Sequence, residues 1–234
     1  MRRCDGDCNG LFADAQDRVW IDADGDGVWD PASEEFLFAP LLRLGEHRYA
    51  LRADAWGQKL ELARLEGTGR LKLALPSMKP ERVREVVATF QSRDGVVATI
   101  RQQDAEVTVP VGEYRISSLL LTLQDPKGGP AWGYVFCDNG GRPPRWHKLS
   151  RGGTVSVDAV GKLDFTASAG EGGKCKAGES LTVRPALYTG DGLLIERAYR
   201  GEFAAETYEQ GCAGKVTLRG KGERLLESAA SGFA

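Results

Sequence analysis

A repeat of 17 residues near the start of the chain constrains the fold more than any other sequence feature. The first copy begins Asp-Gly-Asp-Cys-Asn-Gly-Leu-Phe at residues 5–12, and the second begins Asp-Ala-Asp-Gly-Asp-Gly-Val-Trp at residues 22–29. Each copy has an acid at its thirteenth position, Asp17 or Glu34, and an apolar run that starts two residues later. Two such matches in one register are much rarer by chance than a single match.

The alternating oxygen-bearing side chains match the ligand pattern of a calcium loop. Ca²⁺ takes roughly 6–8 oxygen ligands, which such a loop supplies from side chains at positions 1, 3 and 5 and from the backbone carbonyl at position 7, after a glycine at position 6. Crowded carboxylates repel one another unless a cation neutralises them. The competing interpretation is a pair of solvated turns, because Asp, Asn and Gly are also strong turn residues.

We favour calcium, with about two ions in a structural role. The predicted ligands, taken from both copies, are Asp5, Asp7, Asn9, Leu11, Asp14, Asp17, Asp22, Asp24, Asp26, Val28, Asp30 and Glu34.

The outer end of each loop departs from the EF-hand pattern, in which position 12 is a bidentate Glu. Gln16 and Ser33 hold that position here, and the acid follows one residue later. Asp30 could serve at position 9 of the second copy, whereas the first copy has Ala13 there and Asp14 next. The sequence therefore predicts the inner ligands and leaves the choice among the outer acids open.

The two copies resemble EF-hand-like calcium loops that lack flanking helices, as in dockerin modules and thrombospondin type 3 repeats. The resemblance covers residues 5–34 only. Residues 18–21 separate the two loops, and their Val-Trp-Ile centre favours a strand. Because dockerins have a helix at this place, the resemblance does not imply cohesin binding.

The rest of the chain is predicted to be all-β, because short alternating apolar runs are separated by turn residues. Residues 36–75 are expected to form successive hairpins of a small antiparallel sheet beside the calcium loops. The Asp94-Gly95 pair between two apolar runs is a strong hairpin signal. The small, polar tail from Ser228 is expected to fray.

Three modules are expected along the chain: a tandem calcium-loop and hairpin region at 1–78, a β-sandwich at 79–157 and a second β-sandwich at 158–234. Residues 110–116, Pro-Val-Gly-Glu-Tyr-Arg-Ile, are similar to the closing strands of prealbumin-like and carboxypeptidase-regulatory-like sandwiches. The strand spacing after residue 158 favours an immunoglobulin-like sandwich. Residues 79–234 as a single unit are the alternative.

Composition limits the classes of function. Of 234 residues, 41% are hydrophobic and 27% are charged, with a net charge of −2, and no Lys/Arg run suggests nucleic-acid binding. No apolar run approaches the ~18 residues that span a bilayer. No apolar signal peptide follows Met1, yet such calcium loops suit a calcium-rich exterior. We therefore expect a fragment of a longer bacterial protein that is secreted, periplasmic or attached to the cell surface.

The odd number of cysteines leaves their state open. Pairs between Cys4 and Cys8 and between Cys175 and Cys212 are plausible disulfides, and buried thiols, Cys137 among them, are the alternative. Zinc is a weaker interpretation, because the chain has no C-x-x-C motif and has only two histidines.

A strand of alternating aromatic residues is the other candidate site. Trp132, Tyr134 and Phe136 would share one face of this strand, and Trp146 follows a turn-rich stretch. Such a face either belongs to the core or stacks on polysaccharide rings.

The chain has no catalytic motif. We therefore predict a non-catalytic, calcium-binding structural or adhesive module, with a carbohydrate-binding module or an accessory domain of an extracellular hydrolase as the alternative.

Overall fold

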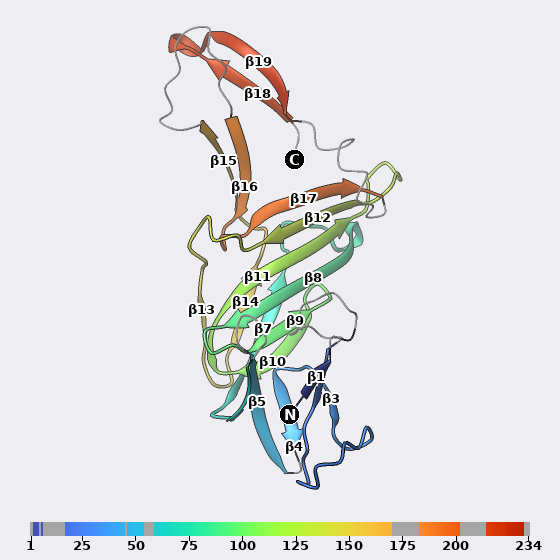
Figure 1. Cartoon of the computed structure of the whole chain (residues 1–234). Helices are drawn as coiled ribbons and strands as arrows, with labels where there is room; N and C mark the ends of the chain where they lie inside the picture. Colours follow the sequence, from blue (N-terminus) through green and yellow to red (C-terminus); the bar gives the residue numbers. More distant parts are fainter. Residues whose placement is uncertain are drawn as a thin grey trace. The chain divides into compact units, whose positions relative to one another are not determined.

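The protein is almost entirely β-structure. The computed structural model describes residues 2–4, 6, 17–44, 46–53, 59–169, 183–201 and 214–231. These residues form nineteen strands and two short 3₁₀ turns, arranged mostly in antiparallel sheets (Figure 1). The predicted all-β fold is confirmed. No helix in the described ranges is long and apolar enough to cross a membrane.

The chain divides into two compact units that are interleaved in the sequence. The first unit consists of Met1–Leu75, Val87–Ser117 and Arg145–Asp158, and the second consists of Pro76–Val86, Ser118–Pro144 and Ala159–Ala234. Two of the unit boundaries, after Leu75 and after Asp158, lie close to the module boundaries expected after residues 78 and 157. The three-module division itself stays a prediction.

The first unit begins with a three-stranded antiparallel sheet. It consists of β1 (Arg2–Cys4), β2 (Arg18–Trp20) and β3 (Glu35–Leu37), in that order. The strand predicted between the two loops is therefore present as β2. The second loop of the repeat connects β2 to β3, so pairing of these two strands closes the loop at its base.

A second sheet of the first unit is an antiparallel meander of β4 (Leu41–Leu44), β5 (His47–Ala53) and β6 (Leu60–Arg64). Its apolar face shares one buried cluster with residues that flank the second loop, which places the loop beside the small sheet as expected. Each fully buried aliphatic or aromatic side chain contributes roughly 1.5–3 kcal/mol. The cluster consists of Val19, Ile21, Phe38, Leu42, Leu51 and Ala53.

The next strand, β7 (Thr68–Ala74), corrects the expectation of successive hairpins. It pairs antiparallel with β10 (Glu106–Pro110) and parallel with β14 (Thr154–Asp158). The expected turn at residues 67–69 is not observed, because Thr68 and Gly69 already belong to β7. Leu71 and Leu73 are completely buried, and a strand with a buried face is stabilised best where both of its edges are paired.

The predicted hairpin at Asp94-Gly95 is present in the first unit. β8 (Val83–Ser92) and β9 (Val97–Ile100) pair across the Asp94-Gly95 turn, where Gly95 has a φ of +82°. The Ser92 hydroxyl accepts a 2.9 Å hydrogen bond from the Val96 amide, and the Gly95 carbonyl accepts a 2.8 Å bond from the Ala53 amide. The turn is thereby joined to the meander.

The Pro-Val-Gly-Glu-Tyr segment forms a corner between β10 and β11 (Gly112–Leu123). Tyr114 is 1% exposed, and its hydroxyl donates a 2.9 Å hydrogen bond to the carbonyl of Pro110. Burial raises the pKa of the Tyr114 hydroxyl. A Tyr hydroxyl that bonds to the backbone a few residues upstream is a known closing device of β-sandwiches, so this segment has a structural role. The start of β11 also pairs with β13 (His147–Leu149).

The second unit is built on one antiparallel series of strands. The end of β11 pairs with β12 (Trp132–Cys137), which pairs with β17 (Leu194–Arg200). β17 continues the series through β16 (Val183–Thr189) to β15 (Leu163–Ala169). The 3₁₀ turn η1 (Pro80–Arg82) precedes β8.

The end of the chain forms a separate hairpin of the second unit. β18 (Gly214–Arg219) pairs antiparallel with β19 (Leu225–Ser231), with the 3₁₀ turn η2 (Lys221–Glu223) between them. The expected fraying from Ser228 is therefore not observed through Ser231, because these small residues pair with β18.

Candidate metal centre

Three carboxylates of the second loop lie together. One carboxylate oxygen from each of Asp22, Asp24 and Glu34 lies within 4.8 Å of the other two. Asp22 follows β2 and Glu34 precedes β3, and the two strands pair with Trp20 opposite Glu35. The strand pair therefore brings together the first and thirteenth positions of the repeat, which are far apart along the loop.

The inner aspartates also organise the backbone of the loop. Asp22 accepts hydrogen bonds from the amides of Gly25 and Gly27, at 2.8 and 3.2 Å. Both glycines have positive φ, +79° and +74°, a conformation that residues with a Cβ rarely adopt. Asp24 accepts a 3.1 Å bond from the Asp26 amide. Each carboxylate oxygen has further lone pairs, so these bonds shape the loop without excluding a cation.

Glu34 is the buried member of the cluster. It is only 3% exposed, whereas Asp22 and Asp24 are exposed. Its Oε1 accepts a 2.8 Å hydrogen bond from the Ala23 amide, and its Oε2 accepts a 3.1 Å bond from the Asp30 amide. A buried carboxylate requires such partners, because an unpaired buried charge is costly. Glu34 therefore links both ends of the loop.

The first copy of the repeat repeats this contact. The Gly6 amide donates a 3.1 Å hydrogen bond to Oδ1 of Asp17, which is 1% exposed. Gly6 and Ala23 both hold the second position of the repeat, and Asp17 and Glu34 both hold the thirteenth. The two acids that follow the EF-hand position 12 are thus buried in the same way, and the 17-residue repeat is a structural repeat at these positions.

The structure separates the outer acids of the second loop. Asp30 lies outside the three-carboxylate cluster, and its oxygens accept bonds from the Ala32 amide at 2.9 Å and from the Ser33 hydroxyl at 2.7 Å. The bond from Ser33, followed by that from Ala32, lowers the pKa of Asp30. Asp26 also lies outside the cluster, and its Oδ1 accepts a 2.7 Å bond from the Val28 amide.

Several predicted site residues lie outside the described residues. They are the remaining ligands of the first copy, Asp5, Asp7, Asn9, Leu11 and Asp14, and the cysteines Cys8, Cys175 and Cys212. Cys4 is exposed and Cys137 is half-buried, and burial raises the pKa of the Cys137 thiol to about 11. The predicted disulfides stay predictions.

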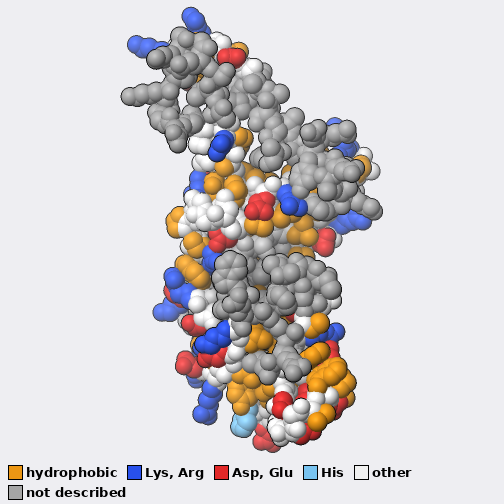
Figure 2. Space-filling view, viewed as in Figure 1, with side chains coloured by type: hydrophobic (Ala, Val, Ile, Leu, Met, Phe, Trp, Pro, Cys, Tyr) orange, Lys and Arg blue, Asp and Glu red, His pale blue; other side chains and the backbone are white. Residues whose placement is uncertain are grey.

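A tryptophan pair, which the sequence did not reveal as a pair, belongs to the same loop. The rings of Trp20 and Trp29 stack with their centroids 4.5 Å apart, and Trp29 is 47% exposed. Val28 and Leu37 are also exposed, and Figure 2 shows hydrophobic side chains beside acidic ones in the region of β3. The indole pair therefore provides an optical signal for the conformation of the loop.

The predicted aromatic strand is present as β12. Phe136 is buried, whereas Trp132 and Tyr134 are half-buried. Their cross-strand neighbours on β11 include the buried Leu119 and Leu121, so this face carries part of the core of the second unit.

Trp146 belongs to the first unit and has different surroundings. The guanidinium carbons of Arg93 and Arg115 lie 4.1 and 5.6 Å from the centroid of its ring. Arg93 also donates a 2.6 Å hydrogen bond to Glu113. These cation–π contacts with the indole stabilise the half-buried side chain.

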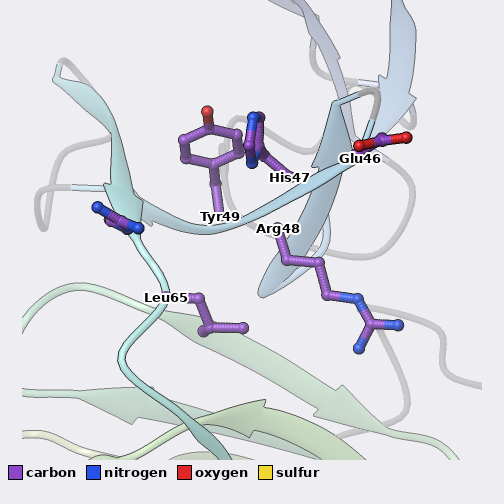
Figure 3. A pocket seen from close by; sticks show the side chains of 6 residues that line it. Glu46, His47, Arg48, Tyr49 and Leu65 are labelled. Carbon is purple, nitrogen blue, oxygen red and sulfur yellow. The ribbon is translucent and has the colours of Figure 1, made fainter.

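The two histidines, the candidates for a zinc site or a catalytic triad, have different positions in the first unit. His147 lies in β13, whereas His47 begins β5 and lines a pocket with Tyr49 and Arg64 (Figure 3). The carboxylate cluster found among the described residues contains neither histidine nor cysteine. Its donors are oxygens only.

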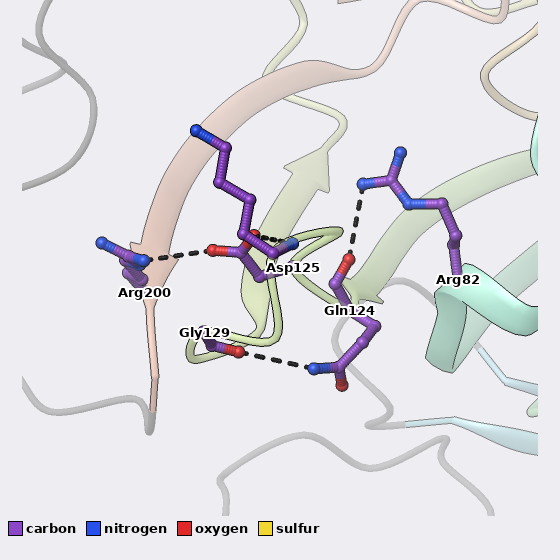
Figure 4. Close-up of polar contacts among 6 residues, drawn as sticks. Arg82, Gln124, Asp125, Gly129 and Arg200 are labelled. Carbon is purple, nitrogen blue, oxygen red and sulfur yellow. Dashed lines mark hydrogen bonds and ion pairs between the residues drawn. The ribbon is translucent and has the colours of Figure 1, made fainter.

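A polar network in the second unit holds the loop between β11 and β12 (Figure 4). Asp125 accepts a 2.8 Å hydrogen bond from the Lys127 amide and a 3.1 Å bond from the Arg200 side chain. These partners, the Lys127 amide first, lower the pKa of Asp125. Gln124 donates to the Gly129 carbonyl at 3.4 Å. The network fastens a loop to β17 and contains no nucleophile with an adjacent base.

The comparisons with family models, with curated proteins and with solved structures find no match to this chain.

Proposed function

We propose that the chain is a calcium-binding, non-catalytic structural or adhesive module of an exported bacterial protein, in which Ca²⁺ rigidifies the N-terminal loops. One observation carries the proposal. The cluster of Asp22, Asp24 and Glu34 is closed by a hydrogen bond from position 2 to position 13, and the first copy contains the same bond from Gly6 to Asp17.

The donor set of the second loop suits a hard cation. Three carboxylates that each place one oxygen within 4.8 Å of the others repel one another, and a divalent cation would remove this repulsion. Oxygen-only donors favour Ca²⁺ or Mg²⁺ over zinc or copper. Ca²⁺ accepts the irregular geometry of a flexible loop more readily than Mg²⁺, which requires a near-ideal octahedron. In the proposal the repeat pattern supplies further oxygens from Asp26 and from the Val28 carbonyl.

Calcium would stabilise the module as a folding ligand. A ligand that binds only the native state stabilises it by RT ln(1 + [L]/Kd), which is about 2.7 kcal/mol per site at 100 times Kd. Val19, Ile21 and Phe38 flank the loop and pack in the same cluster as the meander. Stabilisation of the loop would therefore extend to the neighbouring sheet, as a rigid stalk or an adhesive module requires.

Thermal unfolding in EDTA and in millimolar calcium tests the proposal. We expect calcium to raise the melting temperature by about 5 °C or more, since 1 kcal/mol corresponds to roughly 2–4 °C for a chain of this size. Asp22→Asn and Asp24→Asn should abolish most of this shift. Asp158→Asn, which removes an exposed carboxylate of β14, is the matched control and should retain it. A melt that EDTA does not change would contradict the proposal.

A carbohydrate-binding module or an accessory domain of an extracellular hydrolase is the second candidate. The partial exposure of Trp132 and Tyr134 on β12 favours it, because half-exposed rings can stack on sugars. Titration with polysaccharides should then change the tryptophan fluorescence of the wild type but not of Trp132→Phe. No change with any polysaccharide would leave the calcium module as the sole proposal.

A further inference from the structure

A pocket at one end of the β4–β6 meander has the chemistry of an anion site. It is separate from the acidic cluster, and all its residues belong to the first unit. The residues that line it are Glu46, His47, Arg48, Tyr49, Arg64 and Leu65 (Figure 3).

Strand geometry brings an imidazole, a phenol ring and a guanidinium to one face. His47 and Tyr49 are two residues apart in β5, so both leave the same face, and their ring centroids lie 6.5 Å apart in an edge-to-face contact. Arg64 lies directly opposite Tyr49 in the β5–β6 pair, so it shares that face. Figure 3 shows Arg48 leaving β5 on the other side of the strand.

This face is also the core face of the meander. Leu51 and Ala53, further along β5, belong to its buried cluster, whereas His47 is exposed at the end of the strand. The pocket therefore lies where the apolar core stops. Leu65, which follows β6, adds an apolar side chain to its lining.

Two arginines and one acid line the pocket, and Arg64 is the arginine that shares the face of His47 and Tyr49. Among the described residues, neither Arg48 nor Arg64 forms an ion pair with an acidic side chain, and Glu46 is the one acid in the lining. Elsewhere in the first unit, other arginines do have acidic partners. Those pairs are Arg18–Glu35, Arg52–Asp94, Arg70–Glu106 and Arg93–Glu113.

We infer that this pocket binds an oxyanion, a carboxylate or a phosphate, that is attached to a ring. The Arg64 guanidinium presents paired N–H donors that match the two oxygens of such a group. His47 supplies a further N–H donor, and the ring of Tyr49 packs against the ring of the ligand. The inference does not depend on calcium.

The two histidines make the inference testable by NMR, because His47 lines the pocket and His147 does not. The protein is titrated in EDTA with glucuronate, glucose 6-phosphate and glucose while the imidazole signals are recorded. We expect a saturable shift of the His47 signals with one or both anions, no shift with glucose and no change at His147. The anion that shifts His47 at the lower concentration identifies the source of the oxyanion.

Matched variants assign the binding group. Arg64→Gln should weaken anion binding by about tenfold or more, and Arg64→Lys should weaken it less, because Lys keeps the charge but loses the paired donors. Arg101→Ala removes an exposed arginine of the same unit and should leave the affinity unchanged. Equal shifts with glucose, equal shifts at His147, unchanged affinity in Arg64→Gln, or no saturable shift would each overturn the inference. An EDTA-insensitive melt would leave it intact.

Discussion

Val19 and Phe36 lie opposite each other at the centre of the β2–β3 pair, and both hold the fifteenth position of the repeat. The neighbouring pairs, Arg18 with Leu37 and Trp20 with Glu35, join position 14 of one copy to position 16 of the other. The strand residues that end the two copies are therefore related by a local two-fold axis through this pair of residues.

Backbone hydrogen bonds follow the same symmetry. The Ile21 amide donates a 3.0 Å bond to the Glu34 carbonyl, and the Phe38 amide donates a 2.8 Å bond to the Asp17 carbonyl. In each case position 17 of one copy binds position 13 of the other. The two buried acids therefore flank one shared ladder, and a change at either acid should affect both copies.

Glu34→Gln tests the role of the buried acid. The amide group of Gln cannot accept both backbone bonds, so we expect the free energy of unfolding in EDTA to fall by about 2 kcal/mol. The calcium-dependent rise in melting temperature should also disappear. Urea unfolding followed by the fluorescence of the stacked Trp20 and Trp29 measures the first effect, and thermal unfolding with and without calcium measures the second.

The neighbouring residue provides the control. Glu35 forms only a partly exposed ion pair with Arg18, at 3.6 Å, so Glu35→Gln should change stability by less than about 1 kcal/mol and keep the calcium effect. Equal losses in both variants would show that the position of Glu34 has no special role.

Tyr114→Phe tests the corner between β10 and β11. The change leaves the Pro110 carbonyl without its 2.9 Å bond in a buried site, so we expect a loss of about 1.5 kcal/mol in urea unfolding. Tyr188→Phe in the second unit keeps the ring that lies 4.3 Å from the Arg142 guanidinium, and it should cost less than about 0.5 kcal/mol. A Tyr114→Phe variant that is as stable as the wild type would contradict the structural role of the Pro-Val-Gly-Glu-Tyr segment.

Gly95→Ala tests the close contact between the hairpin turn and the meander. An added Cβ would meet the Ala53 carbonyl oxygen, and the φ of +82° disfavours any residue with a Cβ. We therefore expect the clash and the backbone strain together to lower the free energy of unfolding by about 3 kcal/mol. Gly128→Ala has a similar φ of +75° but open space around the Cβ, and strain alone should cost about 1 kcal/mol. Similar losses in the two variants, measured by urea unfolding, would disprove the contact.

The lowered pKa of Asp125 predicts a loss of stability in acid. Its folded pKa lies below the ordinary value of 3.8, so the stabilisation is complete above the unfolded pKa and is lost as the pH falls through the folded pKa. Asp125→Asn should therefore be less stable than the wild type at pH 7, and the two should converge in strong acid. Arg200→Gln should remove only part of this pH-dependent stabilisation, because the Lys127 amide still donates its hydrogen bond to Asp125. Urea unfolding across this pH range measures the effect, and parallel curves for wild type and Asp125→Asn would contradict it.

Local patterns in the sequence predicted much of the candidate site. The D-x-D-x-D-G pattern identifies Asp22 and Asp24, and the register of the repeat identifies the acids at its thirteenth position. The choice of Glu34 over Asp30 required the structure, because both lie near the end of the loop in sequence. The β2–β3 pairing brings Glu34 to Asp22, while Ser33 and Ala32 bind Asp30 within its own turn.

By itself the sequence determined the all-β class, the loop repeat and the turns, because alternation and turn chemistry act over a few residues. Tertiary structure alone decided that β7 pairs with β10 and β14, that the chain interleaves its two units, and that Tyr49 meets Arg64. Strand pairing joins residues that are distant in sequence, and the apolar surface available for burial selects the partner. A local pattern predicts that a strand will form, but the shared core decides which strand it pairs with.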